Sequence, residues 1–290
     1  MSAAEALLSR MVDYAGLFPP ASLDLPTAVR NYHRYLEGDA AWMLGHFLLP
    51  ASRLAEFATA FEEVCCTEQE APWTLSVICA GETVADARAI EQFQQGAIFL
   101  RALEVRAADA DAARQVLEHL PAVQARFVEF PLEQAGQILP VLAEYGASAK
   151  LRLGGVTPAS IPPVEAVAQV LLACARERVA FKATAGLHHP IRGRHPLTPE
   201  PSAPEATMHG FLNLFLAAAL AWFGADEAAV IRTLAEEDPA AFHLDDDVIA
   251  WQGHSLIADQ LEQVRASFAI GFGSCSFTEP VDDLRTMGWI

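Results

Sequence analysis

Short apolar runs of strand length alternate along the chain with stretches whose apolar residues recur about every 3.6 positions. The predicted strands cover residues 11–18, 42–49, 74–79, 99–105, 125–130, 149–153, 180–184 and 268–273. The predicted helices between them include residues 26–36, 52–64, 84–94, 109–120, 132–145 and 163–178. This alternation is typical of βαβ units and predicts a parallel sheet.

Eight strands separated by helices close most simply into a (β/α)8 TIM barrel, an α/β fold. A chain of 290 residues is a usual length for one such domain, so we predict a single domain over residues 1–290. An open doubly wound sheet is the alternative, because periodicity does not distinguish a closed sheet from an open one. Its nucleotide-binding form is disfavoured, because neither G-x-G-x-x-G nor G-x-x-x-x-G-K-[ST] follows an early strand.

The region before the last strand departs from a simple repeat. Residues 187–208 are rich in proline and lack periodicity, which predicts a functional loop, most simply a lid. Two helices, over residues 209–223 and 226–236, are predicted to follow it. Residues 242–256 contain three consecutive aspartates between apolar residues and predict a hairpin added to the barrel.

Composition narrows the classes of partner. The formal net charge is −18, which would repel a nucleic-acid backbone, and 52% of the residues are hydrophobic, which is ample for a large core. The longest apolar run, residues 211–223, is too short to span a bilayer, so we expect no membrane association. The first ten residues do not resemble a secretion signal, and five cysteines without a C-x-x-C spacing suggest no disulfide framework. We therefore expect a cytoplasmic protein without a cofactor; the sequence leaves open whether it forms a homo-oligomer.

The chain contains 17 arginines but only two lysines, Lys150 and Lys182. Both lie within predicted strands, where an unpaired ammonium is costly to bury. Strand alternation places Lys150 on one face with Arg152, and Lys182 on one face with Thr184, opposite apolar neighbours. In a barrel the apolar face meets the helices, so we expect these four side chains to point inward. A lysine can lose its proton and act as a nucleophile, which an arginine cannot, so the two lysines predict a reaction centre. The alternative is that an arginine-rich genome has left two lysines by chance.

Two other predicted strands also carry charges. Glu104 and Arg106 share one face of their strand, and Glu129 lies on the next strand. With the lysines, Glu104 and Glu129 would form a proton-transfer network. The competing interpretation is a structural layer of ion pairs inside the barrel.

An anionic partner is indicated by the local charge. Residues 145–199 contain seven basic residues and only two acidic ones, in a chain that is otherwise strongly acidic. Such a region concentrates small anions. His188 and His189 follow the strand of Lys182, so they are predicted to lie at the barrel mouth, where barrel enzymes have their sites. We therefore predict a small anionic molecule as the partner.

Over the last three predicted strands the chain resembles the deoxyribose-phosphate aldolase group of class I aldolases. The likeness consists of Lys150, the stretch Lys182-Ala-Thr-Ala-Gly186, and Ile270-Gly-Phe-Gly-Ser-Cys-Ser276. It implies a Schiff-base lysine at Lys150, a second lysine at Lys182, and an anion-binding loop that includes Gly273, Ser274 and Ser276. The residues after Lys150 are Leu-Arg-Leu, where the aldolase group has Thr-Ser-Thr.

Three further stretches resemble an uncharacterised bacterial protein family with a (β/α)8 barrel. They are Asp13-Tyr-Ala-Gly-Leu-Phe-Pro-Pro20, Phe181-Lys-Ala-Thr-Ala-Gly-Leu-His-His-Pro190 and Gly273-Ser-Cys-Ser-Phe277. This resemblance implies no activity. It does single out Asp13, which is close enough to the first predicted strand to reach the barrel mouth.

Three functions remain open at this point. The leading one is an aldolase-like lyase, in which Lys150 forms an imine with a small anionic carbonyl compound. Glu104 or Glu129 would then be the acid and base. The second is a metal-dependent hydrolase or isomerase with His188, His189 and His209 as ligands; neither H-x-H nor H-E-x-x-H occurs, so we predict no metal site. The third is a barrel that binds a small anion without catalysis.

Overall fold

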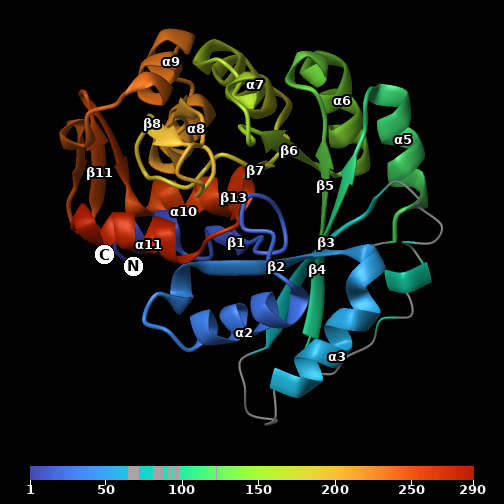
Figure 1. The fold of residues 1–290 in the computed structure, drawn as a ribbon. Coiled ribbons are helices and arrows are strands. Elements are labelled where there is room, and N and C mark those ends of the chain that lie inside the picture. Colours follow the sequence, from blue (N-terminus) through green and yellow to red (C-terminus); the bar gives the residue numbers. More distant parts are fainter. Residues whose placement is uncertain (65–71, 81–85, 87, 91–92, 94–97, 122) are drawn as a thin grey trace.

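Eight parallel strands form a closed barrel in the computed structural model of the protein (Figure 1). The structure describes residues 1–64, 72–80, 86, 88–90, 93, 98–121 and 123–290. The barrel strands are β1 (Val12–Tyr14), β2 (Leu44–Pro50), β3 (Trp73–Ile78), β4 (Ile98–Arg106), β5 (Ala125–Glu129), β6 (Ser148–Arg152), β7 (Phe181–Thr184) and β13 (Ala269–Ser274). Their order around the barrel is β1-β13-β7-β6-β5-β4-β3-β2. The predicted TIM barrel is confirmed, and the open sheet is not the fold.

Helices surround the barrel (Figure 1). They are α1 (Ala3–Leu8), α2 (Leu25–Leu36), α3 (Leu54–Val64), α5 (Ala110–His119), α6 (Ala135–Tyr145), α7 (Val164–Glu177), α8 (Phe211–Trp222), α9 (Glu227–Ala235), α10 (Ala258–Ser267) and α11 (Thr278–Thr286). Short 3-10 helices cover η1 (Ala41–Met43), η2 (Ala51–Arg53), η3 (Leu132–Gln134), η4 (Pro158–Ser160) and η5 (Pro239–Ala241). The helix predicted over residues 84–94 lies largely outside the described residues.

Local sequence signals explain where several helices begin and end. Asp24, Asp109 and Asp226 precede α2, α5 and α9, and each accepts a hydrogen bond from the backbone N–H three residues further on. These contacts satisfy donors that a helix leaves unpaired at its start. Helix α6 ends at Gly146, whose φ of 59° lies in the left-handed region that glycine adopts without strain.

The additions before β13 are more regular than predicted. Within residues 187–208, strands β8 (Gly193–Pro196) and β9 (Glu205–Met208) form an antiparallel hairpin, which we call the mouth hairpin. The predicted hairpin over residues 242–256 is a three-stranded antiparallel sheet of β10 (Phe242–Leu244), β11 (Val248–Trp251) and β12 (His254–Ile257). Both contain too few alternating apolar residues for periodicity to resolve every strand.

Helix α8 is buried on all sides. Residues 211–221 are all buried, and the helix packs against α7, α9 and α10. Asn213 is the polar residue in this run; its amide donates to the carbonyls of Thr233 and Glu236 and accepts from the backbone N–H of Arg192. An apolar surface all round is typical of a helix that is buried on every side, and the helix predicted over residues 209–223 is confirmed.

One stretch has the length and hydropathy of a membrane span. Among the described residues it is Pro158–Glu177, with a mean hydropathy of 1.3, and 28% of its window is buried. It joins η4 to α7, and α7 packs against α6, α8 and α9 as one of the helices around the barrel (Figure 1).

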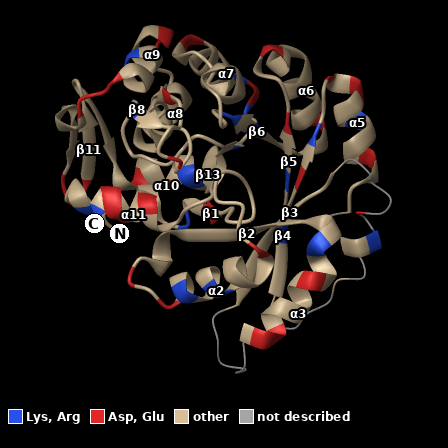
Figure 2. Ribbon diagram, in the orientation of Figure 1, with Lys and Arg blue, Asp and Glu red and all other residues tan. Residues whose placement is uncertain are grey.

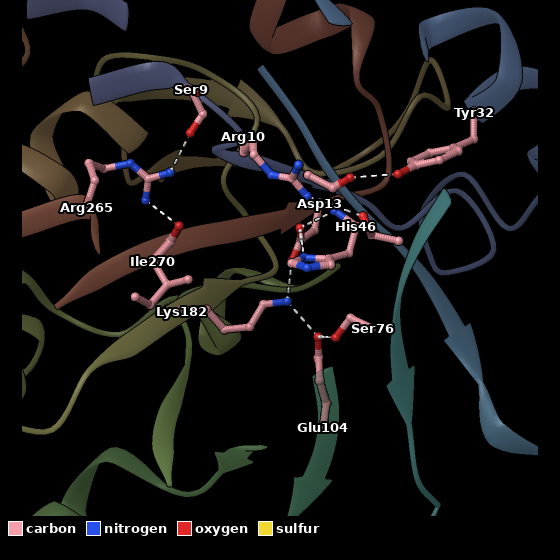
Figure 3. A network of polar contacts seen from close by, with 12 residues as sticks. Ser9, Arg10, Asp13, Tyr32, His46, Ser76, Glu104, Lys182, Arg265 and Ile270 are labelled. Carbon is pink, nitrogen blue, oxygen red and sulfur yellow. Dashed lines mark hydrogen bonds and ion pairs between the residues drawn. The ribbon is translucent and has the colours of Figure 1, made fainter. Parts of the chain in front are cut away.

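Charged residues lie both on the outer helices and on the barrel strands. Acidic residues are spread over outer helices such as α3, α5 and α11, and charged residues also lie on barrel strands near β4 and β5 (Figure 2). At the amino-terminal end of the barrel, the half-buried Arg265 donates from its guanidinium to the carbonyls of Leu7, Ser9, Ala269 and Ile270. Figure 3 shows its contacts with Ser9 and Ile270. The cavity lined by Glu104 and Lys150 opens at the opposite, carboxyl-terminal end.

Candidate active site

Parallel register brings the charged residues of four neighbouring strands together. Arg106 of β4 pairs in register with Glu129 of β5, and Glu129 pairs with Lys150 of β6. Lys150 in turn pairs with Lys182 of β7. Leu151, which lies between Lys150 and Arg152 on β6, is completely buried and faces the helices, as strand alternation predicts. The charged set faces the barrel interior.

Lys182 is the more deeply placed of the two lysines, with 1% of its surface exposed. Its Nζ donates hydrogen bonds to Asp13 Oδ2 at 2.5 Å and to Glu104 Oε1 at 2.6 Å (Figure 3). The same ammonium lies 5.2 Å from the centroid of the Phe127 ring. Two carboxylates and a ring face fix Lys182 as a charged group in the barrel interior.

Lys150 is held differently. Its Nζ lies 2.8 Å from Glu104 Oε2 and 3.0 Å from Glu129 Oε2, so Glu104 contacts both lysines. Neither of these two carboxylate oxygens has a hydrogen-bond partner of good geometry among the described residues. Lys150 is therefore held between two carboxylates, Glu104 and Glu129, at ion-pair distance.

The network strongly favours its charged forms. Burial opposes ionisation of Glu104, yet the charges of Lys150 and Lys182 lower its pKa to about 2. Burial likewise disfavours the anion of Asp13, but Lys182 and His46 hold its pKa well below the usual range. Burial would lower the pKa of Lys182, but Asp13 and Glu104 raise it above its ordinary value. Lys182 is thus a permanent cation at neutral pH and not a nucleophile.

The outer end of the network carries two guanidinium groups. Glu129 Oε1 accepts from Arg152 Nε at 2.9 Å and lies 3.1 Å from Arg106 Nε. Burial opposes ionisation of Glu129, but Lys150 and Arg152 lower its pKa. Both arginines use only Nε here, and their terminal nitrogens have no partner in the part of the chain that the structure describes. With 72% of the Arg106 side chain and 41% of the Arg152 side chain exposed, these nitrogens are available to an anion.

Two polar residues of the network were missed by sequence reasoning. The His46 backbone N–H donates to Asp13 Oδ1 at 2.6 Å, and His46 Nδ1 lies 2.9 Å from the same oxygen (Figure 3). Ser76 Oγ donates to Glu104 Oε1 at 2.6 Å. Each is a polar residue within an apolar strand, β2 or β3, which is the signal that also identified the lysines.

A cavity of about 860 Å³ opens above the network at the barrel mouth. The predicted site residues that line it are Glu104, Arg106, Lys150, Arg152, Thr184, His188 and Gly273. Glu129 lines an adjoining cavity that shares both arginines, and Lys182 and Asp13 are not among the residues lining either one. Lys150 is therefore the lysine that a substrate in this cavity can contact.

The predicted anion-binding loop after β13 has other hydrogen bonds. The Ser276 N–H donates to Ser274 Oγ at 3.3 Å, and Ser276 Oγ accepts from the Glu279 N–H at 3.2 Å. Of the three predicted residues, Gly273 lines the cavity and Ser274 is almost fully buried. The negative charge of Glu279 at the start of α11 lies beside this loop and disfavours an anion there. Arg106 and Arg152 are therefore better placed than the loop to bind an anion.

The three predicted histidines have different partners. His188 Nδ1 lies 2.8 Å from Glu279 Oε2, and His189 Nδ1 lies 2.7 Å from Asp283 Oδ2. Buried His209 contacts the Pro162 carbonyl instead. Within the described ranges, no group of three or more His, Cys, Asp or Glu side chains is placed to hold a metal ion. The donor geometry does not favour the metal-dependent alternative.

His189 stacks on His195 of the mouth hairpin, with 3.6 Å between ring centroids. Burial and the neighbouring His189 lower the pKa of His195 below its ordinary 6.5, although Asp283 and Glu279 act in the opposite direction. The folded state therefore disfavours protonation, so the stability that neutral His195 gives to the hairpin is present above pH 6.5. It is lost as the pH falls below that value.

We expect the mouth hairpin to open more often at pH 5.5 than at pH 7.5. Hydrogen exchange of the amides in residues 193–208, corrected for intrinsic rates, measures this opening. His195→Phe keeps a stacked ring without the charge and should remove the pH dependence. Equal protection of the wild type at both pH values would contradict the expectation.

Comparison of the chain with models of known protein families, with curated proteins and with solved structures gives no match. The class of the protein is therefore defined by its architecture: it is an α/β protein with a closed barrel of eight parallel strands surrounded by helices, a TIM-like barrel. The finer likeness to the aldolase group stays an interpretation of the residues around Lys150 and Lys182.

Proposed function

We propose that the protein is an aldolase-like lyase that forms an imine between Lys150 and a small anionic carbonyl compound. The observation that carries this proposal is the position of the Lys150 Nζ, which borders the cavity within 3.0 Å of two carboxylates. A lysine that must gain and lose protons during catalysis needs acceptors of this kind.

Imine formation needs no group beyond these side chains and the substrate. The Lys150 ammonium gives one proton to Glu129, and the freed electron pair forms a C–N bond at the carbonyl carbon. The nitrogen passes a second proton to the former carbonyl oxygen. Glu129 then returns its proton, so that the oxygen leaves as water and a cationic imine remains.

The cationic imine then accepts electrons from the bond that breaks. The electron pair of the bond between the α and β carbons forms a C=C bond between the α carbon and the imine carbon, and the C=N electron pair moves to nitrogen, which gives a neutral enamine. The hydroxyl on the departing carbon loses its proton to a carboxylate, Glu104 or Glu129, and this fragment leaves as an aldehyde. Protonation of the enamine and hydrolysis of the imine by water return Lys150.

The other residues of the site bind the substrate or position the reacting lysine. Arg106 and Arg152 have unused guanidinium nitrogens beside Lys150, which supports a role in binding the anionic group. Thr184, His188 and the Gly273, Ser274 and Ser276 loop are further candidates for substrate contacts. Lys182 is a positioning residue, because it is fully paired and acts on Lys150 through Glu104.

Borohydride trapping tests the imine. Wild-type protein incubated with a panel of aldehydes and 2-oxo acids and then reduced should gain the mass of one reduced adduct. Peptide mapping should place the adduct at Lys150, which is easily distinguished from Lys182 as the only other lysine. Lys150→Arg keeps a cation between Glu104 and Glu129 and should form no adduct.

Two results would overturn the proposal. One is the absence of any adduct at Lys150 across the panel, and the other is an adduct that forms only at Lys182 or at the amino terminus. Unchanged anion binding by Lys150→Arg, together with no adduct in the wild type, would favour a non-catalytic anion-binding barrel.

A further inference from the structure

The cavity above Lys150 has two chemically different sides. Strands β4 and β6 supply its charged lining residues Glu104, Arg106, Lys150 and Arg152. The opposite arc, from β1 to β3 and the loops that follow them, supplies Phe18, Pro19, Pro20, Leu48, Pro50 and Ile78. No charged side chain of that arc lines the cavity within the described residues. The separation follows from strand order, because β1, β2 and β3 are consecutive in the barrel.

The mouth hairpin extends the apolar side. Leu197, which follows β8, and Met208 of β9 both line the cavity. Leu48 is almost completely buried, and Phe18 and Ile78 are half-buried. An apolar surface arranged around a cavity, rather than scattered over the exterior, marks a place where an apolar group is bound.

The volume of the cavity gives a second, independent argument that its ligand extends beyond the charged side. The cavity volume of about 860 Å³ is in the upper part of the range of about 300–1,000 Å³ that is typical of pockets for drug-sized ligands. A three-carbon oxo acid bound at Lys150 and the arginines would occupy only the charged side. A sugar phosphate would fill more space but would place hydroxyl groups against Phe18, Leu48 and Ile78 without partners, which is unfavourable.

We infer that the substrate carries, besides its carbonyl and anionic groups, a branched aliphatic or aromatic group that binds against the β1–β3 arc. The anion lies on Arg106 and Arg152, the carbonyl carbon reaches Lys150, and the apolar group lies toward Phe18 and Leu48. The inference rests on the proposed function for the carbonyl, but the apolar subsite can be tested without imine chemistry.

Ligands that lack a carbonyl isolate the subsite. We expect affinity, measured by calorimetry, to rise about fourfold per added methylene from propanoate to 4-methylpentanoate. A parallel series of alkyl phosphates distinguishes a carboxylate from a phosphate as the preferred anion. Glycerol phosphate, which is similar in size but hydroxylated, should bind more weakly than an alkyl phosphate of equal length.

A substitution in the apolar arc should remove this selectivity. Phe18→Ser is expected to reduce the advantage of 4-methylpentanoate over propanoate about tenfold. Phe223→Ser changes an exposed phenylalanine that does not line the cavity and should leave the series unchanged. If chain length has no effect on wild-type affinity, or if glycerol phosphate binds more tightly than the alkyl phosphate, the apolar subsite is wrong.

Trapping separates the two proposals. Adducts at Lys150 that form at lower concentrations of 4-methyl-2-oxopentanoate or phenylpyruvate than of pyruvate support both. Chain-length-dependent binding without any adduct would retain the apolar subsite and overturn the imine. Adducts that form equally well with pyruvate and with the larger oxo acids would retain the imine and overturn the subsite.

Discussion

Glu104→Leu is expected to lower the free energy of unfolding by about 3–5 kcal/mol, the range found when one member of a buried ion pair is removed. Glu104 is completely buried and contacts Lys182 and Lys150 through its two oxygens. Without it, each buried lysine is left with one carboxylate, Asp13 or Glu129, in place of two. The loss of Glu104 also leaves Ser76 Oγ without its acceptor.

Urea unfolding followed by circular dichroism measures this loss. Glu56→Leu is the control, because Glu56 pairs with Arg53 at the exposed surface, where such a pair contributes little. Its unfolding midpoint should stay close to that of the wild type. A Glu104→Leu protein as stable as the Glu56→Leu protein would show that the buried network does not hold the barrel together.

Hydrophobic periodicity was sufficient to predict the alternation of strands and helices, because each strand packs its alternate residues against helices, but it did not by itself distinguish the closed barrel from an open sheet. The predicted ends of strands and helices were less accurate where the apolar pattern covers only a few residues. The first strand was predicted over residues 11–18 but ends at Tyr14, because residues 15–18 turn toward the two prolines. Helix α1 was not predicted, although Ser2 and Glu5 form the capping box that signals its start.

The inward charges could be found from sequence because they interrupt apolar strands. Strand alternation gives the face on which Lys150 and Lys182 lie, but it does not give their depth along the barrel axis. That depth depends on the stagger between strands, which a single sequence does not reveal. Strand alternation therefore left the two lysines equivalent, and only the resemblance to the aldolase group singled out Lys150. The structure makes Lys150 a cavity residue and Lys182 a buried cation.

Long-range partners were the other missing information. His46 contacts Asp13 across 33 positions, and Lys182 contacts it across 169. No local pattern encodes such pairs, because the first depends on the pairing of β1 with β2 and the second on closure of the sheet between β1 and β13. The apolar arc at the mouth was missed for the same reason, since its members come from three strands and appear in sequence as ordinary core residues.

Acid should destabilise the protein mainly through this network. On folding, the pKa of Glu104 falls from its ordinary 4.5 to about 2, and that of Asp13 falls in the same direction. The unfolded chain therefore takes up protons first, so the stabilisation by Glu104 is complete above pH 4.5 and is lost as the pH falls toward 2. At about 1.4 kcal/mol for each pH unit, Glu104 accounts for about 3 kcal/mol of this loss.

The acid dependence of wild-type stability and the Glu104→Leu substitution thus both measure the ion pairs that Glu104 forms with the two lysines. Urea unfolding of the wild type between pH 5 and pH 2 should give a steep fall in stability, and Glu104→Leu, which is already weaker at pH 7, should show a smaller fall over the same range. Asp13, Glu129 and the other carboxyl groups whose pKa folding lowers, such as Glu279, give the remaining slope in both proteins. Because folding raises the pKa of Lys182, its own contribution is complete below its ordinary 10.5 and is lost only as the pH rises above that value, so it adds nothing to the acid limb. Parallel curves for the two proteins would mean that folding does not lower the pKa of Glu104, which would contradict the ion pairs assigned to it.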